Sequence, residues 1–190
     1  QTSNTAQTIF SVYFYDENVG YAAGGSGTIL YTIDGGVNWT LKANVIPQTL
    51  TFVRSISPTT CLVVGGGGTI LKTVDGGITW ISQTSGTINY LSAVNYSDSN
   101  TVWIVGSGGQ ILKSMDGGTT WTNQISGTSN ALYSIYFQDS KSGWIVGESG
   151  TILKFQSDDS TKIIQTETNI TFADSISFSE TGNMVIFDSI

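Results

Sequence analysis

The segment YTIDGGVNW at residues 31–39 is repeated twice along the chain, as KTVDGGITW at residues 72–80 and KSMDGGTTW at residues 113–121. The copies are equally spaced, without an insertion or a deletion, so their aspartates fall at Asp34, Asp75 and Asp116. The glycine before the adjacent apolar segment keeps the same spacing and recurs at Gly27, Gly68, Gly109 and Gly150. A fixed period of about 41 residues indicates a repeat architecture, in which each unit packs against its neighbours.

Each repeat contains four short segments with the pattern of β-strands. The first segment alternates apolar and other residues, as at 91–96 and 132–137, which is typical of a half-buried strand. The second ends in glycine, the third leads into Asp-Gly-Gly, and the fourth surrounds the tryptophan. Four short strands per period, joined by tight turns, predict an all-β fold, namely a β-propeller with about four visible blades.

The period also divides the chain into repeats. Residues 1–155 contain four of them, at approximately 1–41, 42–82, 83–123 and 124–155. Residues 156–190 are more acidic, with a net charge of −5 against −2 for residues 1–155. We expect this β-rich segment to be either a degenerate fifth repeat, equivalent to half a blade, or the start of another domain. Residues 175–178 (SISF) fall one period after residues 134–137 (SIYF), as the first alternative requires, but few other residues agree and both alternatives stay open.

The repeated Thr/Ser-x-Asp-x-Gly-x-x-Trp pattern resembles the Asp-box, also called the bacterial neuraminidase repeat. In a hairpin turn an aspartate accepts hydrogen bonds from backbone N–H groups, glycine adopts positive φ, and tryptophan fills the space between blades. We therefore expect a structural role for these residues: Thr32, Asp34, Gly36, Trp39, Thr73, Asp75, Gly77, Trp80, Ser114, Asp116, Gly118 and Trp121. In the fourth repeat, Ser157 replaces the aspartate and Lys162 replaces the tryptophan.

The longer phrase GWIVGESGTILK at residues 143–154 is similar to the propeller family of photosystem II assembly and stability factors, which has secreted, non-photosynthetic relatives. The similarity covers approximately residues 1–155. It implies a non-enzymatic scaffold that binds proteins in a lumenal, periplasmic or exported location. The usual family member has about seven blades, so this chain departs from the family in length.

Composition and charge exclude several classes of protein. The chain has 7 Lys and Arg residues and 14 Asp and Glu residues. The basic residues form no cluster that would neutralise phosphates, so nucleic-acid binding is not expected. No apolar run reaches the roughly 18–20 residues of a membrane span. Cys61 is the single cysteine and histidine is missing, so we expect no intramolecular disulfide, metal site or cofactor. The start at Gln1 indicates either a mature chain from which a leader was removed or an excerpt from a longer chain. The Lys-poor composition favours a secreted or periplasmic protein.

Enzymatic activity is not expected either. Asp-box sialidases use an arginine triad, whereas Arg54 is the single arginine here. Asp-box glycosidases use two facing carboxylates, but Asp16, Asp98 and Asp139 share one repeated turn and would lie on equivalent blades. We therefore assign no catalytic residue.

The candidate binding face consists of positions that vary between repeats while their neighbours stay apolar, and these positions are Tyr13, Arg54, Asn95 and Tyr136. We expect these side chains to point away from the core, toward the channel. The chain is thus predicted to bind a protein partner or to assemble with copies of itself through its terminal strands. The alternative is a carbohydrate-binding propeller that stacks sugars on Trp103 and Trp144, although their shared repeat position favours packing between blades.

Overall fold

The computed structural model describes residues 3, 5–44, 46–158, 160–166, 176–178 and 184–186. Side chains are described for residues 3, 5–42 and 46–156. Over this part of the chain every regular element is a β-strand or a three-residue 3₁₀ turn. None of the described residues belongs to a helix long and apolar enough to span a membrane.

Sixteen strands form four antiparallel four-stranded sheets, which we call blades 1 to 4, and the strands of each blade pair in chain order. Blade 1 consists of β1 (Ile9–Phe14), β2 (Gly20–Gly24), β3 (Thr28–Thr32) and β4 (Thr40–Asn44). Blade 2 consists of β5 (Leu50–Ser55), β6 (Cys61–Gly65), β7 (Ile70–Thr73) and β8 (Ile81–Ser82). Blade 3 consists of β9 (Leu91–Tyr96), β10 (Val102–Gly106), β11 (Ile111–Ser114) and β12 (Thr122–Gln124). Blade 4 consists of β13 (Leu132–Phe137), β14 (Ser142–Gly147), β15 (Ile152–Asp158) and β16 (Ser160–Thr166).

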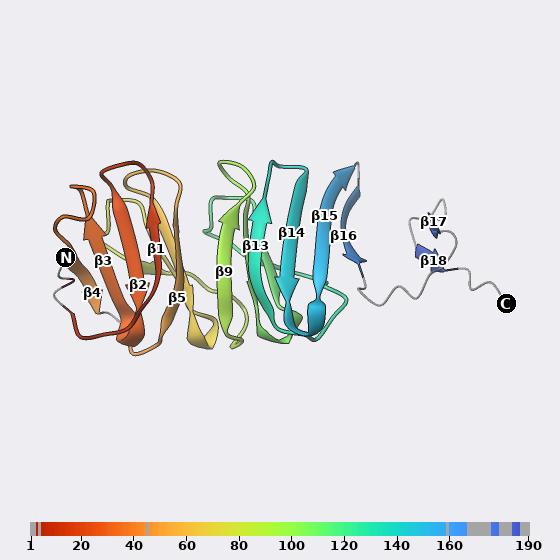
Figure 1. Cartoon of the computed structure of the whole chain (residues 1–190), viewed down its shortest axis with the longest axis horizontal. Coiled ribbons are helices and arrows are strands. Elements are labelled where there is room, and N and C mark those ends of the chain that lie inside the picture. The colour runs from red at the N-terminus through yellow and green to blue at the C-terminus, as the bar shows by residue number, and fades with distance from the viewer. Residues whose placement is uncertain are drawn as a thin grey trace.

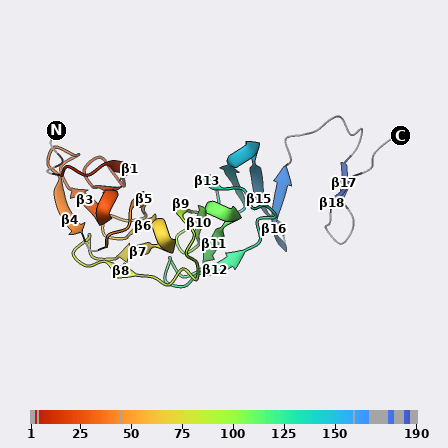
Figure 2. The same ribbon diagram turned by 90° about the horizontal axis from the view of Figure 1, so that it is seen from below.

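The blades follow one another along an arc. Figures 1 and 2 show the first strands, β1, β5, β9 and β13, on the concave side and the fourth strands on the convex side. All extensive contacts between blades join consecutive ones, through β1 and β5, β5 and β9, and β9 and β13. The prediction of a propeller with about four visible four-stranded blades is confirmed, and the four described blades form an open arc (Figure 2).

The core lies between the blades, in three clusters of buried apolar side chains, one at each junction. Successive side chains of a strand point to opposite faces, so each middle strand supplies two junctions. In β6, Val63 packs toward blade 1, whereas Leu62 and Val64 pack toward blade 3. Burial on both faces explains why the second strands read as continuous apolar runs, such as CLVVG and VWIVG.

At each end of the arc, one blade face is not covered by another of the described blades. On blade 1, Val12 is 57% exposed, whereas the equivalent Val53 and Val94 are each 1% exposed inside junctions. On blade 4, Val146 is 43% exposed, whereas the equivalent Val105 is fully buried. The terminal faces therefore carry the apolar residues of a junction without the neighbouring blade.

The second and third strands of each blade are joined by what we call the glycine turns, Gly25–Gly27, Gly66–Gly68, Ser107–Gly109 and Glu148–Gly150. The third residue is always glycine with positive φ, from 67° to 73°. A Cβ atom at Gly68 would overlap the carbonyl oxygen of Thr87, in the linker that enters blade 3. The backbone N–H of Gly68 donates a hydrogen bond of 2.9 Å to the carbonyl of Asn89 in the same linker. Glycine here permits each linker to cross close to the preceding blade.

The fourth blade extends past the boundary expected at residue 155. Strand β15 continues to Asp158 and pairs with β16 in a tight hairpin, in which Asp158 lies opposite Ser160. In blade 2, by contrast, an Asp-box turn separates Thr73 from Ile81. Where the Asp-box is lost, the ladder of strand pairs thus continues as far as the pair of Asp158 and Ser160. Beyond it, β17 (Ile176–Phe178) and β18 (Met184–Ile186) form a separate two-stranded sheet, and the rest of residues 167–190 lies outside the described residues.

Candidate functional site

The three Asp-box turns share one hydrogen-bond arrangement. In blade 2 the hydroxyl of Thr73 donates to Asp75 Oδ1 at 2.8 Å and accepts the backbone N–H of Gly77 at 2.9 Å. Asp75 also accepts the backbone N–H of Thr79 at 2.9 Å and the Thr79 hydroxyl at 2.6 Å. The same bonds recur in the turns that begin at Thr32 and Ser114, with Asn38 and Thr120 as donors. The carboxylates are thus engaged within their own turns.

The Asp-box tryptophans pack beside these turns. Trp80 meets the ring of Tyr21, in blade 1, edge to face at 6.3 Å between centroids. Trp121 packs against the apolar cluster between blades 2 and 3, while Trp39 contacts Phe14 of its own blade at 5.8 Å. Trp80 and Trp121 therefore lie at junctions between blades, whereas Trp39 lies on blade 1, at the end of the arc.

The hydrogen bonds also set the acidity of the Asp-box carboxylates. The hydroxyl and backbone N–H of Thr79, together with the Thr73 hydroxyl, lower the pKa of Asp75 to about 2 from 3.8. Equivalent bonds lower the pKa of Asp34 and Asp116. A carboxyl group with a lowered pKa stabilises the folded state above its unfolded pKa, and this contribution disappears as the pH falls through the folded pKa.

We expect acidification to destabilise the protein partly through Asp75. Between pH 4 and pH 2 the melting temperature of the wild type should fall, because Asp75 takes up a proton at a higher pH in the unfolded chain than in the folded protein. Asp75→Asn should melt at a lower temperature at pH 7 and should show a shallower fall in acid. Circular dichroism melts from pH 7 to pH 2 measure both effects. Glu17→Gln, an exposed acid outside the Asp-boxes, is the control, and identical acid slopes for all three proteins would contradict the expectation.

The four predicted binding positions do not form one common surface. The guanidinium carbon of Arg54 lies 4.3 Å from the ring centre of Tyr13, so these two side chains are brought together from adjacent blades. Asn95 is only 7% exposed, and its Nδ2 donates a hydrogen bond of 3.1 Å to the carbonyl of Ile135. Tyr136 is 59% exposed on the uncovered face of blade 4. The expectation that all four point away from the core is wrong for Asn95, because these positions face the next blade.

A different set of residues lies on the innermost strands, which line the concave side (Figure 2). Each innermost strand contains a β-bulge, in which one extra residue interrupts the register with the second strand. The bulge residues recur with the period of the repeats, at Phe10, Thr51, Ser92 and Tyr133. A bulge leaves its extra residue unpaired and redirects the side chain. We call these four residues the bulge strip. Sequence analysis missed them, although their variation at a fixed period was a readable signal.

The bulge strip has exposed aromatic rings at its two ends. Phe10 is 55% exposed and Tyr133 is 57% exposed. Between them, the hydroxyl of Thr51 donates a hydrogen bond of 2.6 Å to the carbonyl of Leu91, on the innermost strand of the next blade. Thr51 thus ties β5 to β9, and the bulge strip has an accessible aromatic ring at each end.

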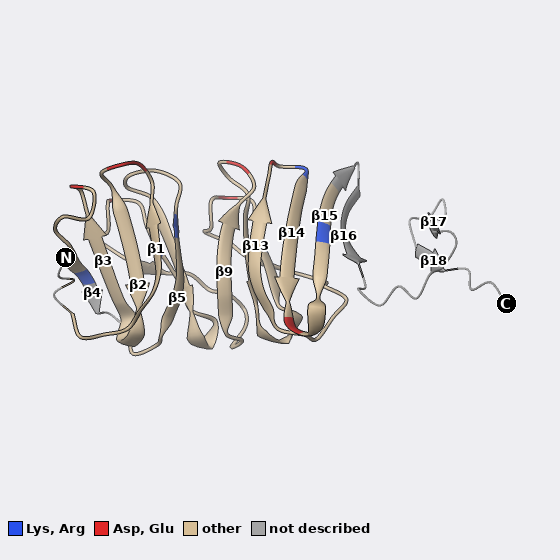
Figure 3. Ribbon diagram, viewed as in Figure 1, with Lys and Arg blue, Asp and Glu red and all other residues tan. Residues whose placement is uncertain are grey.

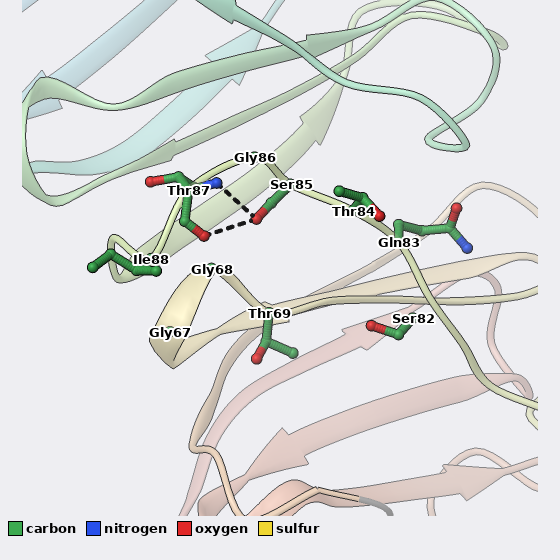
Figure 4. A pocket seen from close by; sticks show the side chains of 10 residues that line it. All are labelled: Gly67, Gly68, Thr69, Ser82, Gln83, Thr84, Ser85, Gly86, Thr87 and Ile88. Atoms are coloured by element: carbon green, nitrogen blue, oxygen red, sulfur yellow. Dashed lines mark hydrogen bonds between the residues drawn. The ribbon is translucent and has the colours of Figure 1, made fainter.

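A shallow groove lies on the opposite side of blade 2 from the Asp-box turn, with a cavity volume of about 740 Å³. It is lined by the glycine turn of that blade and by linker residues 82–88 (Figure 4). The Ser85 hydroxyl donates to the carbonyl of Thr87 at 3.1 Å, so it is satisfied within the linker. The groove presents small polar groups and backbone, and we assign it no ligand.

Most of the described acidic residues gather along one edge of the arc, and Glu148 lies at the opposite edge, in the turn between β14 and β15 (Figure 3). In an antiparallel meander, the turns after the first and third strands lie at the same edge, and these turns hold most of the described acids. Several of these carboxylates accept backbone N–H groups, as Asp98 does from Asn100 at 2.9 Å and Thr101 at 2.8 Å. Among the described residues, no group of three or more His, Cys, Asp or Glu is placed to hold a metal ion.

The aromatic side chains proposed for sugar stacking are not equally accessible. Trp103 is only 1% exposed and is stacked by Phe137 at 5.4 Å. Its face is therefore closed to a ligand. Trp144 occupies the same position one repeat later and is 36% exposed, because no described blade covers it.

Comparison with known proteins gives one family. The family model described as "Photosynthesis system II assembly factor YCF48" matches residues 1–82 and 81–156. These two matches together include most of the chain. Among curated proteins, none matches the chain by sequence.

Three solved structures have similar folds. The structure described as YCF48 bound to D1 peptide has 19% identity and a TM-score of 0.68, and the match covers 96% of this chain and 61% of that one. An ancestral GH74 enzyme has 14% identity and a TM-score of 0.67, with coverage of 87% and 26%. The computationally designed Ika4 protein has 15% identity and a TM-score of 0.68, with coverage of 83% and 96%. The chain thus spans about three fifths of the YCF48 structure it matches, and these identities show likeness of fold alone.

Proposed function

Because the chain belongs to the family of the photosynthesis system II assembly factor YCF48, we propose that it is a non-enzymatic propeller scaffold that binds a protein partner on the concave side of its arc. A structure of YCF48 contains a D1 peptide, which supports a protein-binding role for this relative. The partner we infer is an extended peptide segment that crosses the innermost strands.

The observation that carries this proposal is the bulge strip. Four equivalent bulges place variable residues on the strands that line the concave side, and the outermost two, Phe10 and Tyr133, are aromatic and more than half exposed. Exposed aromatic residues are enriched where proteins bind partners, since they bury large areas at low conformational cost. The repeated backbone between them gives a peptide a regular surface, and the variable side chains give it a register.

The pair of Tyr13 and Arg54 adds a polar contact beside this strip. The Arg54 guanidinium stacks over the Tyr13 ring, which limits its motion while its N–H groups keep their capacity to donate. We propose that this pair holds a carbonyl or carboxylate group of the partner. Neither Asn95 nor Tyr136 is part of this proposal, because Asn95 is buried and Tyr136 lies on the terminal face of blade 4.

Non-enzymatic action is proposed because the carboxylates suited to catalysis are engaged in turns. Asp16 and Asp139 each accept two backbone N–H groups, at 2.7–2.8 Å, and Asp98 occupies the equivalent turn. We further propose that the protein acts outside the cytoplasm, as its low lysine content suggests, and that copies associate through the blade 1 end of the arc. The exposed apolar face of blade 1 supports such association.

The protein-binding proposal is tested with a phage-displayed library of random peptides, panned against the immobilised 190-residue chain. We expect enriched peptides to bind the Phe10→Ser/Tyr133→Ser double variant about tenfold more weakly than the wild type, a loss of about 1.4 kcal/mol. Arg54→Ala should also weaken binding. Affinities are measured by surface plasmon resonance.

The matched control is the Ile88→Ser/Ile125→Ser double variant, which removes two apolar side chains that are 89% and 87% exposed in the linkers. It should bind the peptides as the wild type does. If both double variants lose affinity equally, or neither does, the concave side is not the binding surface.

A further inference from the structure

The uncovered face of blade 4 has the composition of a junction. Tyr136, Trp144, Val146 and Ile152 lie on it and are 36% to 59% exposed. One repeat earlier, the equivalent residues of blade 3 are buried against blade 4, with Trp103 1% exposed and Ile111 fully buried. An aromatic and β-branched face of this kind, on a repeat protein, is suited to the next repeat.

The hairpin of β17 and β18 repeats the register of the first two strands of blade 4. In blade 4, Ile135 lies opposite Ile145, Tyr136 opposite Trp144, and Phe137 opposite Gly143. In the hairpin, Ile176 lies opposite Ile186, Ser177 opposite Val185, and Phe178 opposite Met184. Each residue of the second set follows its counterpart after one period of the repeat. Since register fixes which residues share a face, a shift of one residue would have destroyed this match.

The sequence agrees with the register at the positions that form a junction. Isoleucine is retained at 135 and 176 and at 145 and 186, and phenylalanine is retained at 137 and 178. In blade 4, Ile135, Phe137 and Ile145 belong to the cluster that packs on Trp103 of blade 3. The hairpin thus keeps, in register, the residues by which one blade covers the preceding one.

We propose that β17 and β18 are the two inner strands of a fifth blade, and that this hairpin docks in cis on the uncovered face of blade 4. The occupant of that face is therefore a segment of the same chain, the strands Ile176–Phe178 and Met184–Ile186. Phe178 has the register position of Phe137, so Trp144 becomes the counterpart of Trp103. This inference is independent of the protein-binding proposal, which concerns the concave side.

The test uses the full chain labelled with 5-fluorotryptophan, in which the ¹⁹F resonance of Trp144 is assigned by its loss in Trp144→Phe. The H₂O/D₂O isotope shift of this resonance reports exposure of the indole to solvent. In the wild type we expect a small isotope shift. In Phe178→Ser the Trp144 resonance should move and its isotope shift should increase, while the resonances of the other four tryptophans stay in place.

Phe187→Ser is the matched control. Phe187 falls one period after Val146, which lies on the face of blade 4 that points away from blade 3. In the proposed fifth blade, position 187 would therefore face away from blade 4 and from Trp144. It should leave the Trp144 resonance unchanged. Docking in cis predicts the same spectra from 20 to 500 µM protein. An isotope shift that falls with rising concentration would mean docking between copies, and an equally exposed Trp144 in all variants would mean no docking; either result overturns the proposal.

Discussion

Replacing Trp103 by alanine is expected to reduce the free energy of unfolding by about 3–5 kcal/mol, the range for truncating a large buried aromatic side chain. Trp103 is 1% exposed and lies between blades 3 and 4, where the rings of Phe137 and Phe155 are 5.4 Å and 4.9 Å away. Its indole N–H donates to the Ser97 hydroxyl at 3.3 Å, and Lys113 Nζ lies 4.9 Å from its ring. Urea denaturation followed by circular dichroism measures the loss.

Because stability in a repeat protein is the sum of repeat and junction contributions, the damage should be greatest at this junction. Hydrogen exchange should show lost protection in β10 and β13, and smaller changes in β2 and β3. Trp103→Phe should reduce the free energy of unfolding by less, since an aromatic ring remains at the junction. Tyr133→Ala removes an aromatic that is 57% exposed and should change stability by less than about 0.5 kcal/mol. A loss below about 1 kcal/mol for Trp103→Ala would show that the blades do not depend on this junction.

Gly109→Ala is expected to reduce the free energy of unfolding by more than about 3 kcal/mol, combining a left-handed backbone with a steric overlap. The φ angle of Gly109 is +69°, a value that L-residues rarely adopt. A Cβ atom there would overlap the carbonyl oxygen of Thr128 and would lie 2.8 Å from the Ser126 hydroxyl. The linker into blade 4 would have to move away from blade 3. Chemical denaturation and the melting temperature measure the effect.

Gly108→Ala is the matched control, one residue earlier in the same turn. Its φ angle is +65°, but the nearest atom to a new Cβ is Asn89 Nδ2 at 3.5 Å, so only the conformational cost of about 1 kcal/mol applies. Serine already occupies this position in blades 1 and 4, at Ser26 and Ser149, with φ of 52° and 54°. If Gly109→Ala is no more damaging than Gly108→Ala, the close approach of the linker is not what requires glycine.

The fold could be predicted because the Asp-box repeat carries information at several levels. The constant period gives the size of a blade, and alternation gives its strands. The third segment of each repeat, expected to lead into Asp-Gly-Gly, is β3 (Thr28–Thr32) in blade 1 and β7 (Ile70–Thr73) in blade 2. The predicted resemblance to the photosystem II assembly-factor propellers is confirmed by the family match over residues 1–156.

The orientation of the candidate binding residues could not be predicted from alternation alone. In an isolated sheet, the residue next to a core position such as Val94 faces solvent. Here both faces of blades 2 and 3 are covered, so Asn95 is buried with its amide bonded to the next blade. Which residues of a strand are exposed therefore depends on whether its blade is covered on one face or on both, and a period-two pattern does not encode this.

The bulge strip was hidden for a related reason. A strict alternation assigns Phe10, Thr51, Ser92 and Tyr133 to a face, whereas the bulge removes them from the ladder of paired residues. The bulges depend on how each first strand pairs with a second strand about ten residues away. These four residues differ in polarity, so their equivalent positions in the four repeats are the feature of the sequence that they share.

The linkers that cross the glycine turns bear on how the chain folds during synthesis. Gly27 N–H bonds to Gln48 O and Gly68 N–H bonds to Asn89 O, both at 2.9 Å, so each blade is tied to the segment that follows it. Since the extensive contacts between the four described blades join consecutive ones, none of these blades waits for a distant part of the described chain. Each junction can be completed once one further repeat has left the ribosome, and at about 5–20 residues per second that takes a few seconds. In vectorial folding of this kind one unfinished apolar face moves along with the growing end, while the outer face of blade 1, which carries Val12, stays exposed among the described blades.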